Sequence, residues 1–265
     1  MSSSAEPAAD ERLNQGLKSA VFCVFPKAQV GLPLPLSVHA LSEEGKEATM
    51  SYRMKYPRTP HLPWSPGVSD DDVRVVDVGH FEGREVVVTE KLDGENTTLY
   101  RDHLHARSLD SAHHPSRTQV KRIHGRIACD IPEGWRICGE NMQARHSIHY
   151  LDLLDYFYVF SIWTADNVAL SWPETVAWCE LLELPTVPVL KAPGLWDADE
   201  VQALELDTER QEGYVVRVTD GFAYEQFATR LAKWVRREHV QSDQHWMHQE
   251  MVPNRLRGDR DEREQ

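Results

Sequence analysis

From residue 73 onward the chain is a series of short β-rich segments separated by turn residues, and this pattern constrains the fold more than any other feature. The segments are rich in β-branched residues or alternate polar with apolar residues, and Gly, Asp or Asn lies between them, as is typical of antiparallel strands. Strands are expected at 74–78, 85–91, 97–100, 104–108, 136–138, 156–163, 213–218 and 231–235. Because helical patterns are fewer, the sequence predicts an α+β fold of antiparallel sheets flanked by helices.

Helices are expected at four places. Ser116 and Gln119 form a capping-box pattern ahead of one apolar helical face. Ser171 and Glu174 form a second capping box, for a helix that continues through Leu184. Weaker helical patterns cover 197–211 and 238–251.

Composition divides the chain into three parts. Residues 1–49 lack sustained periodicity, which predicts a flexible leader. Residues 50–240 hold all the expected strands and form the predicted folded domain, whose proline-rich stretch 51–67 must be largely extended or looped. Residues 241–265 are predicted to form a C-terminal helix and a charged tail.

Composition also excludes several classes of protein. A net charge of -13 argues against a general electrostatic grip on nucleic acid, so any such site must be local. No apolar run approaches the roughly 18 residues of a membrane span, and the first residues do not resemble a secretory signal, so we expect a cytoplasmic protein with no membrane partner. The scattered cysteines are expected to be buried free thiols: Cys23, Cys129, Cys138 and Cys179.

The stretch 101–126 is locally basic, with six Lys or Arg residues against two Asp residues and several histidines. Two interpretations remain open. The stretch is either a solvated helix face and loop, or a surface that follows a phosphate backbone.

The segment EKLDGENTTLY, residues 90–100, places Lys91 at the end of an apolar strand, followed by Asp93 and Gly94 in a turn. An amine attacks phosphorus only when it is neutral, so a nucleophilic lysine needs burial or neighbouring cations that lower its pKa. A strand end that opens into a cleft supplies both. The alternative is a Lys-Asp pair beside a hairpin turn.

Further motifs follow this K-x-D-G tetrad in a fixed order: ARS at 106–108, GEN at 139–141, YFYVFSIW at 156–163, EGYVVR at 212–217 and AKWVR at 232–236. The series resembles the covalent nucleotidyltransferase superfamily, and within it the ATP-dependent RNA ligase domain family. The resemblance spans about residues 86–240. It implies an ATP-grasp-like nucleotidyltransferase core without an OB domain, since the thirty or so residues after the last motif are too few for one.

The resemblance implies roles for the residues around the tetrad. Lys91 would be the nucleophile that becomes adenylylated. Glu90, Asp93 and Gly94 would belong to the ATP site. Arg107 would contact a phosphate of the nucleotide or of the acceptor end, since a guanidinium makes bidentate phosphate contacts.

The later motifs complete the implied site. Glu140 would accept hydrogen bonds from the ribose hydroxyls, and Phe160 would stack on the purine. Glu212 would hold a divalent metal near the α-phosphate. Lys233 would neutralise the triphosphate, with Arg236 as a stand-in for a second cation.

The implied activity is that of an ATP-dependent RNA ligase that uses Mg2+ or Mn2+. It would form a lysyl-AMP intermediate and seal a 5′-phosphate to a 3′-hydroxyl end of RNA, as in RNA repair. RNA rather than DNA is favoured by the G-E-N form of one motif and by the segment YPRTPHLP at 56–63. Whether a protein partner supplies end processing is left open.

Three alternatives remain. The first is a DNA ligase or guanylyltransferase on the same core. The second is a non-catalytic nucleotide- or RNA-binding module, in which the departures from the family pattern at Ser161, Arg217 and Arg236 would mark decay. The third is a metal-binding protein built on the thirteen histidines.

Overall fold

The structure is a computed structural model, and it describes residues 53–67, 72–75, 77–111, 113–237 and 251–259. The chain divides into two units, Met1–Ala48 and Thr49–Gln265, and every described residue belongs to the second unit. The expected leader therefore lies outside the described residues, as does nearly all of the helix expected at 238–251. No described helix is long and apolar enough to cross a membrane.

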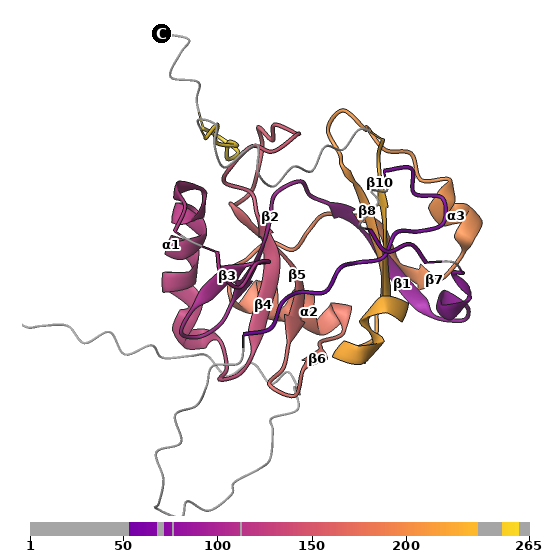
Figure 1. The fold of residues 1–265 in the computed structure, drawn as a ribbon, viewed down its shortest axis with the longest axis horizontal. Helices are drawn as coiled ribbons and strands as arrows, with labels where there is room; N and C mark the ends of the chain where they lie inside the picture. The colour runs from indigo at the N-terminus through magenta and orange to yellow at the C-terminus, as the bar shows by residue number, and fades with distance from the viewer. Residues whose placement is uncertain (1–52, 68–71, 76, 112, 238–250, 260–265) are drawn as a thin grey trace, which may run out of the picture. The chain divides into compact units, whose positions relative to one another are not determined.

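Two antiparallel sheets form the frame of the second unit (Figure 1). The first sheet has four strands in the order β10 (Leu231–Val235), β8 (Gly213–Val218), β1 (Glu85–Lys91) and β7 (Val189–Leu195). The second has six strands in the order β3 (Leu104–Ala106), β2 (Glu95–Leu99), β4 (Arg136–Asn141), β5 (Phe157–Trp163), β6 (Val168–Ala169) and β9 (Phe222–Ala223). The expected α+β fold of antiparallel sheets with flanking helices is confirmed.

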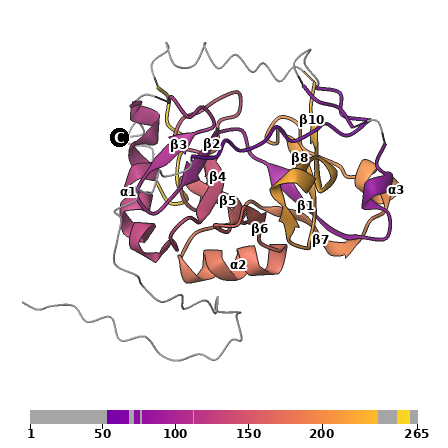
Figure 2. The same cartoon turned by 60° about the horizontal axis from the view of Figure 1, so that its bottom comes forward.

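The described part of the chain holds three α-helices beside the sheets: α1 (Thr118–Ile127), α2 (Trp172–Leu181) and α3 (Ala198–Gln202). It also holds four short 3-10 helices, at Gly79–Phe81, Pro115–Arg117, Ala128–Asp130 and Tyr224–Thr229. The apolar face of α1, formed by Val120, Ile123 and Ile127, packs in one core with buried residues of β4, β5 and α2. Figure 2 shows α2 alongside β5 and β6. Both helices therefore help to bury the six-stranded sheet.

The two expected capping boxes have different outcomes. At α2 the box is confirmed, because Glu174 N donates to Ser171 Oγ at 3.3 Å and Ser171 N donates to Glu174 Oε2 at 2.9 Å. At α1 the prediction is wrong: the N-cap is Arg117, with no side-chain cap. Pro115 starts a 3-10 turn there, in agreement with the preference of proline for the first helical position, and Ser116 lies inside that turn.

Two further elements differ from expectation. The described residues within 74–78 form no strand, and the only β-pairing of Arg74 among the described residues is an isolated bridge with His61. The helix expected at 197–211 ends at Gln202, and turns follow it.

Strand β7 was not expected. Pro193 and Gly194 interrupt its pattern, and proline cannot donate to a strand ladder. Such a strand is tolerated because β7 lies at the edge of the four-stranded sheet and pairs only with β1.

The cysteines agree with expectation in part. Cys138 and Cys179 are buried free thiols, whereas Cys129 is a free thiol that is exposed. Cys23 lies outside the described residues.

The C-terminal segment 251–259 is fastened to the loop that joins β4 to β5. Asn254 is 1% exposed, and its Nδ2 donates to Met142 O at 2.8 Å and to Ala144 O at 3.2 Å. Its Oδ1 accepts from Tyr150 N at 3.0 Å. A single side chain thus ties the start of that loop to its middle.

We expect Asn254→Asp to lower the free energy of unfolding by about 1–3 kcal/mol, since the carboxylate cannot donate to the two buried carbonyls. Urea denaturation measures the change. Val252→Ala is the control in the same segment, because Val252 is 45% exposed, and its effect should stay within about 0.5 kcal/mol. Equal stability of Asn254→Asp and wild type would show that this fastening contributes little.

Candidate active site

The two sheets and the segment that precedes β1 line one cavity of about 950 Å³. Its walls include residues of β1, β2, β4, β5, β8 and β10. The predicted site residues that line it are Glu90, Lys91, Asp93, Gly94, Arg107, Glu140, Phe160, Glu212 and Lys233. These nine residues therefore line the same cavity, although they lie up to 143 positions apart in the sequence.

Lys91 ends β1 inside this cavity, opposite Gly213 of β8. This register brings the residue before Gly213 next to the lysine, and Lys91 Nζ donates to Glu212 Oε2. The Lys91 side chain is 20% exposed, whereas Glu212 is fully buried. The ammonium group of Lys91 thus lies at the cavity surface, and the carboxylate of Glu212 lies behind it.

Carboxylates set the protonation of Lys91. Burial alone lowers the pKa of Lys91, but Glu212, Glu140 and Asp93 outweigh it and raise the pKa above its usual value. The expected lowering of the Lys91 pKa is therefore not observed. With its pKa raised, the side chain is an ammonium ion near pH 7, which cannot attack phosphorus.

Glu140 lies on β4, where its neighbour across the ladder is Asn96 of β2. Its Oε1 accepts from Gly94 N at 3.2 Å. Burial raises the pKa of Glu140 to about 8, helped by Glu212 and Asp93 and opposed by Lys91. A Cβ on Gly94 would lie 2.6 Å from Asn141 O, so only glycine permits this approach of the turn to β4.

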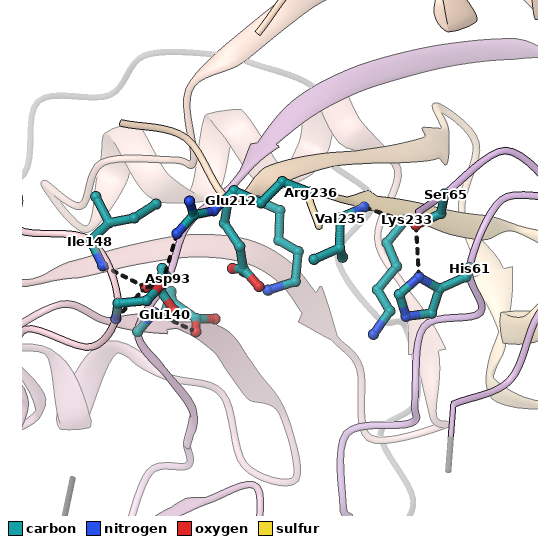
Figure 3. Close-up of polar contacts among 12 residues, drawn as sticks. His61, Ser65, Asp93, Glu140, Ile148, Glu212, Lys233, Val235 and Arg236 are labelled. Carbon is teal, nitrogen blue, oxygen red and sulfur yellow. Dashed lines mark hydrogen bonds and ion pairs between the residues drawn. The ribbon is translucent and has the colours of Figure 1, made fainter. Parts of the chain in front are cut away.

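Asp93 is tied to the loop between β4 and β5. Its Oδ2 accepts from Ser147 Oγ at 2.6 Å and from Ser147 N at 2.8 Å. It also accepts from Ile148 N at 2.9 Å (Figure 3). The carboxylate is 4% exposed. Asp93 therefore fixes the turn after Lys91 to the same loop that Asn254 holds from its other side.

Arg236 lies away from Lys233. Its guanidinium donates to Thr208 O at 2.9 Å and to Ser147 Oγ at 3.3 Å. Side chains alternate along β10, and those that line the cavity are Leu231, Lys233 and Val235, followed by Arg237. The structure thus brings Arg237, which the sequence analysis did not name, to the position proposed for Arg236.

Phe160 lines the cavity and makes an edge-to-face contact with Tyr56, with ring centroids 5.0 Å apart. Arg217, one of the departures from the family pattern, donates to Phe160 O at 3.1 Å and also to Leu170 O. It is buried, and burial lowers its pKa to about 10. Arg217 thus braces the strand that carries Phe160.

The basic stretch 101–126 separates into different environments. Arg107 lines the cavity, while Lys121, Arg122 and Arg126 are exposed on α1. Arg117 is buried and belongs to an ion pair that the sequence analysis missed. Its Nε donates to Glu95 Oε2 at 2.7 Å and its Nη2 to Glu95 Oε1, and both side chains line the cavity.

We expect Arg117→Ala to destabilise the protein by about 3–5 kcal/mol, because it leaves Glu95 as an unpaired carboxylate in a site where the two side chains are 8% and 11% exposed. The double variant Glu95→Gln/Arg117→Met removes both charges and should recover most of that loss. Thermal or urea unfolding of the three proteins checks this. An Arg117→Ala protein as stable as wild type would contradict it.

The side chains of the cavity can be compared with the ligands that a divalent cation requires. Among the described residues, no three His, Cys, Asp or Glu side chains are grouped to hold a metal ion by themselves, so the histidine-based alternative gains no support there. Mg2+ is commonly held by one or two carboxylates together with substrate phosphates. The buried carboxylate of Glu212 and the half-buried carboxylate of Glu140, both beside Lys91, fit such a partial ligand set.

The family model for RNA ligase matches residues 84–235, which is more than half of the chain. The chain therefore belongs to the RNA ligase family. No curated protein matches.

Solved structures of the Naegleria gruberi RNA ligase are similar to this chain. A mutant of that protein with ATP and Mn is 20% identical, with a TM-score of 0.43, over 60% of this chain and 51% of the other. The same protein with PPi is 20% identical, with a TM-score of 0.46, over 69% of this chain and 61% of the other. The match thus covers between half and two thirds of those chains.

Proposed function

We propose that this protein is an ATP-dependent RNA ligase that transfers AMP from ATP to Lys91 Nζ and then joins a 5′-phosphate end of RNA to a 3′-hydroxyl end. The observation that carries the proposal is the position of Lys91 in a chain of the RNA ligase family. The lysine ends a strand inside a cavity, in contact with Glu212 and close to Glu140.

In the first step, the lysine nitrogen attacks the α-phosphorus of ATP, a nitrogen–phosphorus bond forms, and pyrophosphate leaves. Lys91, whose side chain is 20% exposed, must first lose to solvent water the proton that the carboxylates retain. A Mg2+ or Mn2+ ion bound with the nucleotide would neutralise Glu212 and Glu140, so that burial, which lowers the pKa of Lys91, prevails. Lys233 and Arg107 line the same cavity and would meet the charge on the phosphate oxygens.

The remaining cavity residues would hold the nucleoside. Phe160 offers a ring for the purine, and Glu140 offers oxygens for the ribose hydroxyls. AMP would then pass from Lys91 to a 5′-phosphate end, and attack by a 3′-hydroxyl would expel AMP and seal the strand. Positioning and electrostatics would supply most of the rate enhancement. Ends of this kind arise when broken RNA is processed, so we infer a role in RNA repair.

The proposal is tested by incubating the protein with Mg2+ and ATP labelled at the α-phosphate, followed by denaturing electrophoresis. We expect label on the protein, and its transfer to RNA that carries a 5′-phosphate but not to RNA with a 5′-hydroxyl. Label from GTP alone would favour a guanylyltransferase, and sealing of nicked DNA alone would favour a DNA ligase. No label on folded protein, shown by mass to be unmodified, would favour the non-catalytic module.

A further inference from the structure

At one end of the cavity, two nitrogen atoms converge on a single carboxylate. His61 Nε2 lies 3.3 Å from Asp72 Oδ2, and Lys233 Nζ lies 3.4 Å from Asp72 Oδ1. All three residues line the cavity that holds Lys91. Figure 3 shows the side chains of His61 and Lys233 side by side, one from the segment before β1 and the other from β10. The carboxylate of Asp72 is thus an anion of the chain itself that contacts both nitrogen atoms.

The backbone fixes this arrangement. Lys233 N donates to Pro60 O at 2.8 Å, and Leu62 N donates to Lys233 O at 2.7 Å. His61 and Lys233 are therefore paired neighbours in a parallel bridge, and neither can shift without breaking these bonds. Val73, which follows Asp72, accepts from His61 N at 2.7 Å through its carbonyl, so the backbone also keeps Asp72 close to His61. The Asp72 side chain, which is 20% exposed, makes the contacts to His61 and Lys233.

The protonation of His61 makes its Nε2 a hydrogen-bond donor. Burial, with the charge of Lys233 next, lowers the pKa of His61 to about 4, so the ring is neutral near pH 7. Its Nδ1 lies 2.9 Å from Ser65 Oγ, which accepts from Val235 N at 3.0 Å and can donate its own hydrogen to Nδ1. The carboxylate of Asp72 faces Nε2, so we assign the ring hydrogen to Nε2.

This donor is buried and poorly satisfied. The His61 side chain is 1% exposed, and its Nε2 makes no hydrogen bond of good geometry with any described residue, although Asp72 lies within ion-pair distance. A buried N–H without a good acceptor is costly to the folded state. An anion with several oxygens, such as a phosphate chain, could satisfy Nε2 and Lys233 Nζ together, whereas the single carboxylate approaches each at long range.

We propose that His61 and Lys233 form a subsite for the terminal phosphates of a nucleoside triphosphate, and that the Asp72 carboxylate occupies this subsite until the triphosphate displaces it. The inference rests on the proposed function, because it concerns the part of ATP that leaves as pyrophosphate. The subsite would favour a triphosphate over AMP, since AMP lacks the β- and γ-phosphates that would bind His61 and Lys233. Two of its three residues precede the span matched by the RNA ligase family model, which begins at residue 84.

Titration calorimetry tests the subsite without depending on the covalent step. The probes are inorganic pyrophosphate, AMP and α,β-methylene-ATP, whose α–β bridge cannot be cleaved, each with Mg2+ and unmodified protein. Asp72→Asn removes the competing charge, and we expect it to bind pyrophosphate and the ATP analogue about tenfold more tightly, with AMP unchanged.

A matched pair of variants tests His61. In His61→Asn the amide can still reach Ser65 but supplies no donor at the Nε2 position, and binding of the ATP analogue should weaken about tenfold while AMP binding stays unchanged. In His61→Gln the longer amide brings an N–H close to the Nε2 position, so most of that loss should be recovered. Unfolding midpoints of all variants, compared with wild type, separate a binding effect from loss of fold.

The outcomes separate this inference from the proposed function. If wild type binds AMP and the ATP analogue but Asp72→Asn binds pyrophosphate no more tightly, the subsite is wrong and the ligase proposal stands. The subsite is also wrong if the variants change the affinity for AMP as much as that for the analogue. If folded wild type binds no nucleotide at all, the proposed function and the subsite both fail.

Discussion

Replacing Lys91 with Arg is expected to abolish covalent labelling of the protein by ATP while leaving its fold intact. The guanidinium of arginine can still pair with Glu212, which is fully buried, but it stays protonated and cannot attack phosphorus. Labelling with α-labelled ATP and Mg2+, followed by denaturing electrophoresis, measures the effect. The expected change is complete loss of label.

Two companion variants sharpen this test. Lys91→Ala should also lose label, but it leaves Glu212 as a buried charge without its lysine, and we expect it to be less stable by about 3–5 kcal/mol. Lys191→Ala is the control, because Lys191 is on β7 beside β1 and pairs with Glu200 outside the cavity lining. It should label as wild type does. Label retained by Lys91→Arg would assign the nucleophile to another residue.

The second large effect is expected at Gly213. A Cβ added there would lie 1.9 Å from Trp234 O and 3.1 Å from Val235 Cα, so β8 and β10 would have to separate. We expect Gly213→Ala to lower the free energy of unfolding by about 3 kcal/mol or more, as overpacking with backbone displacement does. Guanidinium denaturation followed by circular dichroism measures the loss.

Gly125 supplies the matched control. It lies within α1, and a Cβ added there would meet nothing within 4 Å. Gly125→Ala should stabilise the protein by about 0.5–1 kcal/mol, because alanine loses less conformational entropy in a helix than glycine does. If Gly213→Ala and Gly125→Ala gave the same midpoint, the close approach of β8 to β10 at Gly213 would be refuted.

The sequence could predict most strands and the position of Lys91, because both depend on local pattern. β-Branched residues bounded by turn residues mark β1 and β8, and side chains alternate between the two faces along each strand. The same rule, continued past the end of β10, would have selected Arg237 in place of Arg236 for the cavity. That assignment was missed because the motif was compared by residue type and not by strand face.

Other parts of the site could not be predicted, since they depend on segments without periodicity. Asp72, His61 and Asn254 lie in irregular backbone. Asp72 contacts Lys233, which is 161 positions away, and Asn254 contacts Met142, which is 112 positions away. His61 contacts Ser65, which is 4 positions away. The raised pKa of Lys91 could not be predicted either, because it results from three carboxylates that come together only in the folded chain. The roles of the individual site residues stay predictions.

The edges of the four-stranded sheet are closed in two different ways. On the β10 side, Leu62 and Gly67 donate to backbone carbonyls of Lys233 and Val235, so the segment before β1 occupies the hydrogen-bonding groups of that edge. On the β7 side, Pro193 and the irregular register against β1 make the edge a poor template for pairing with a strand of another chain. A fragment trimmed to the family-matched residues 84–235 would therefore bare the β10 edge, and such fragments should self-associate through strand pairing and precipitate.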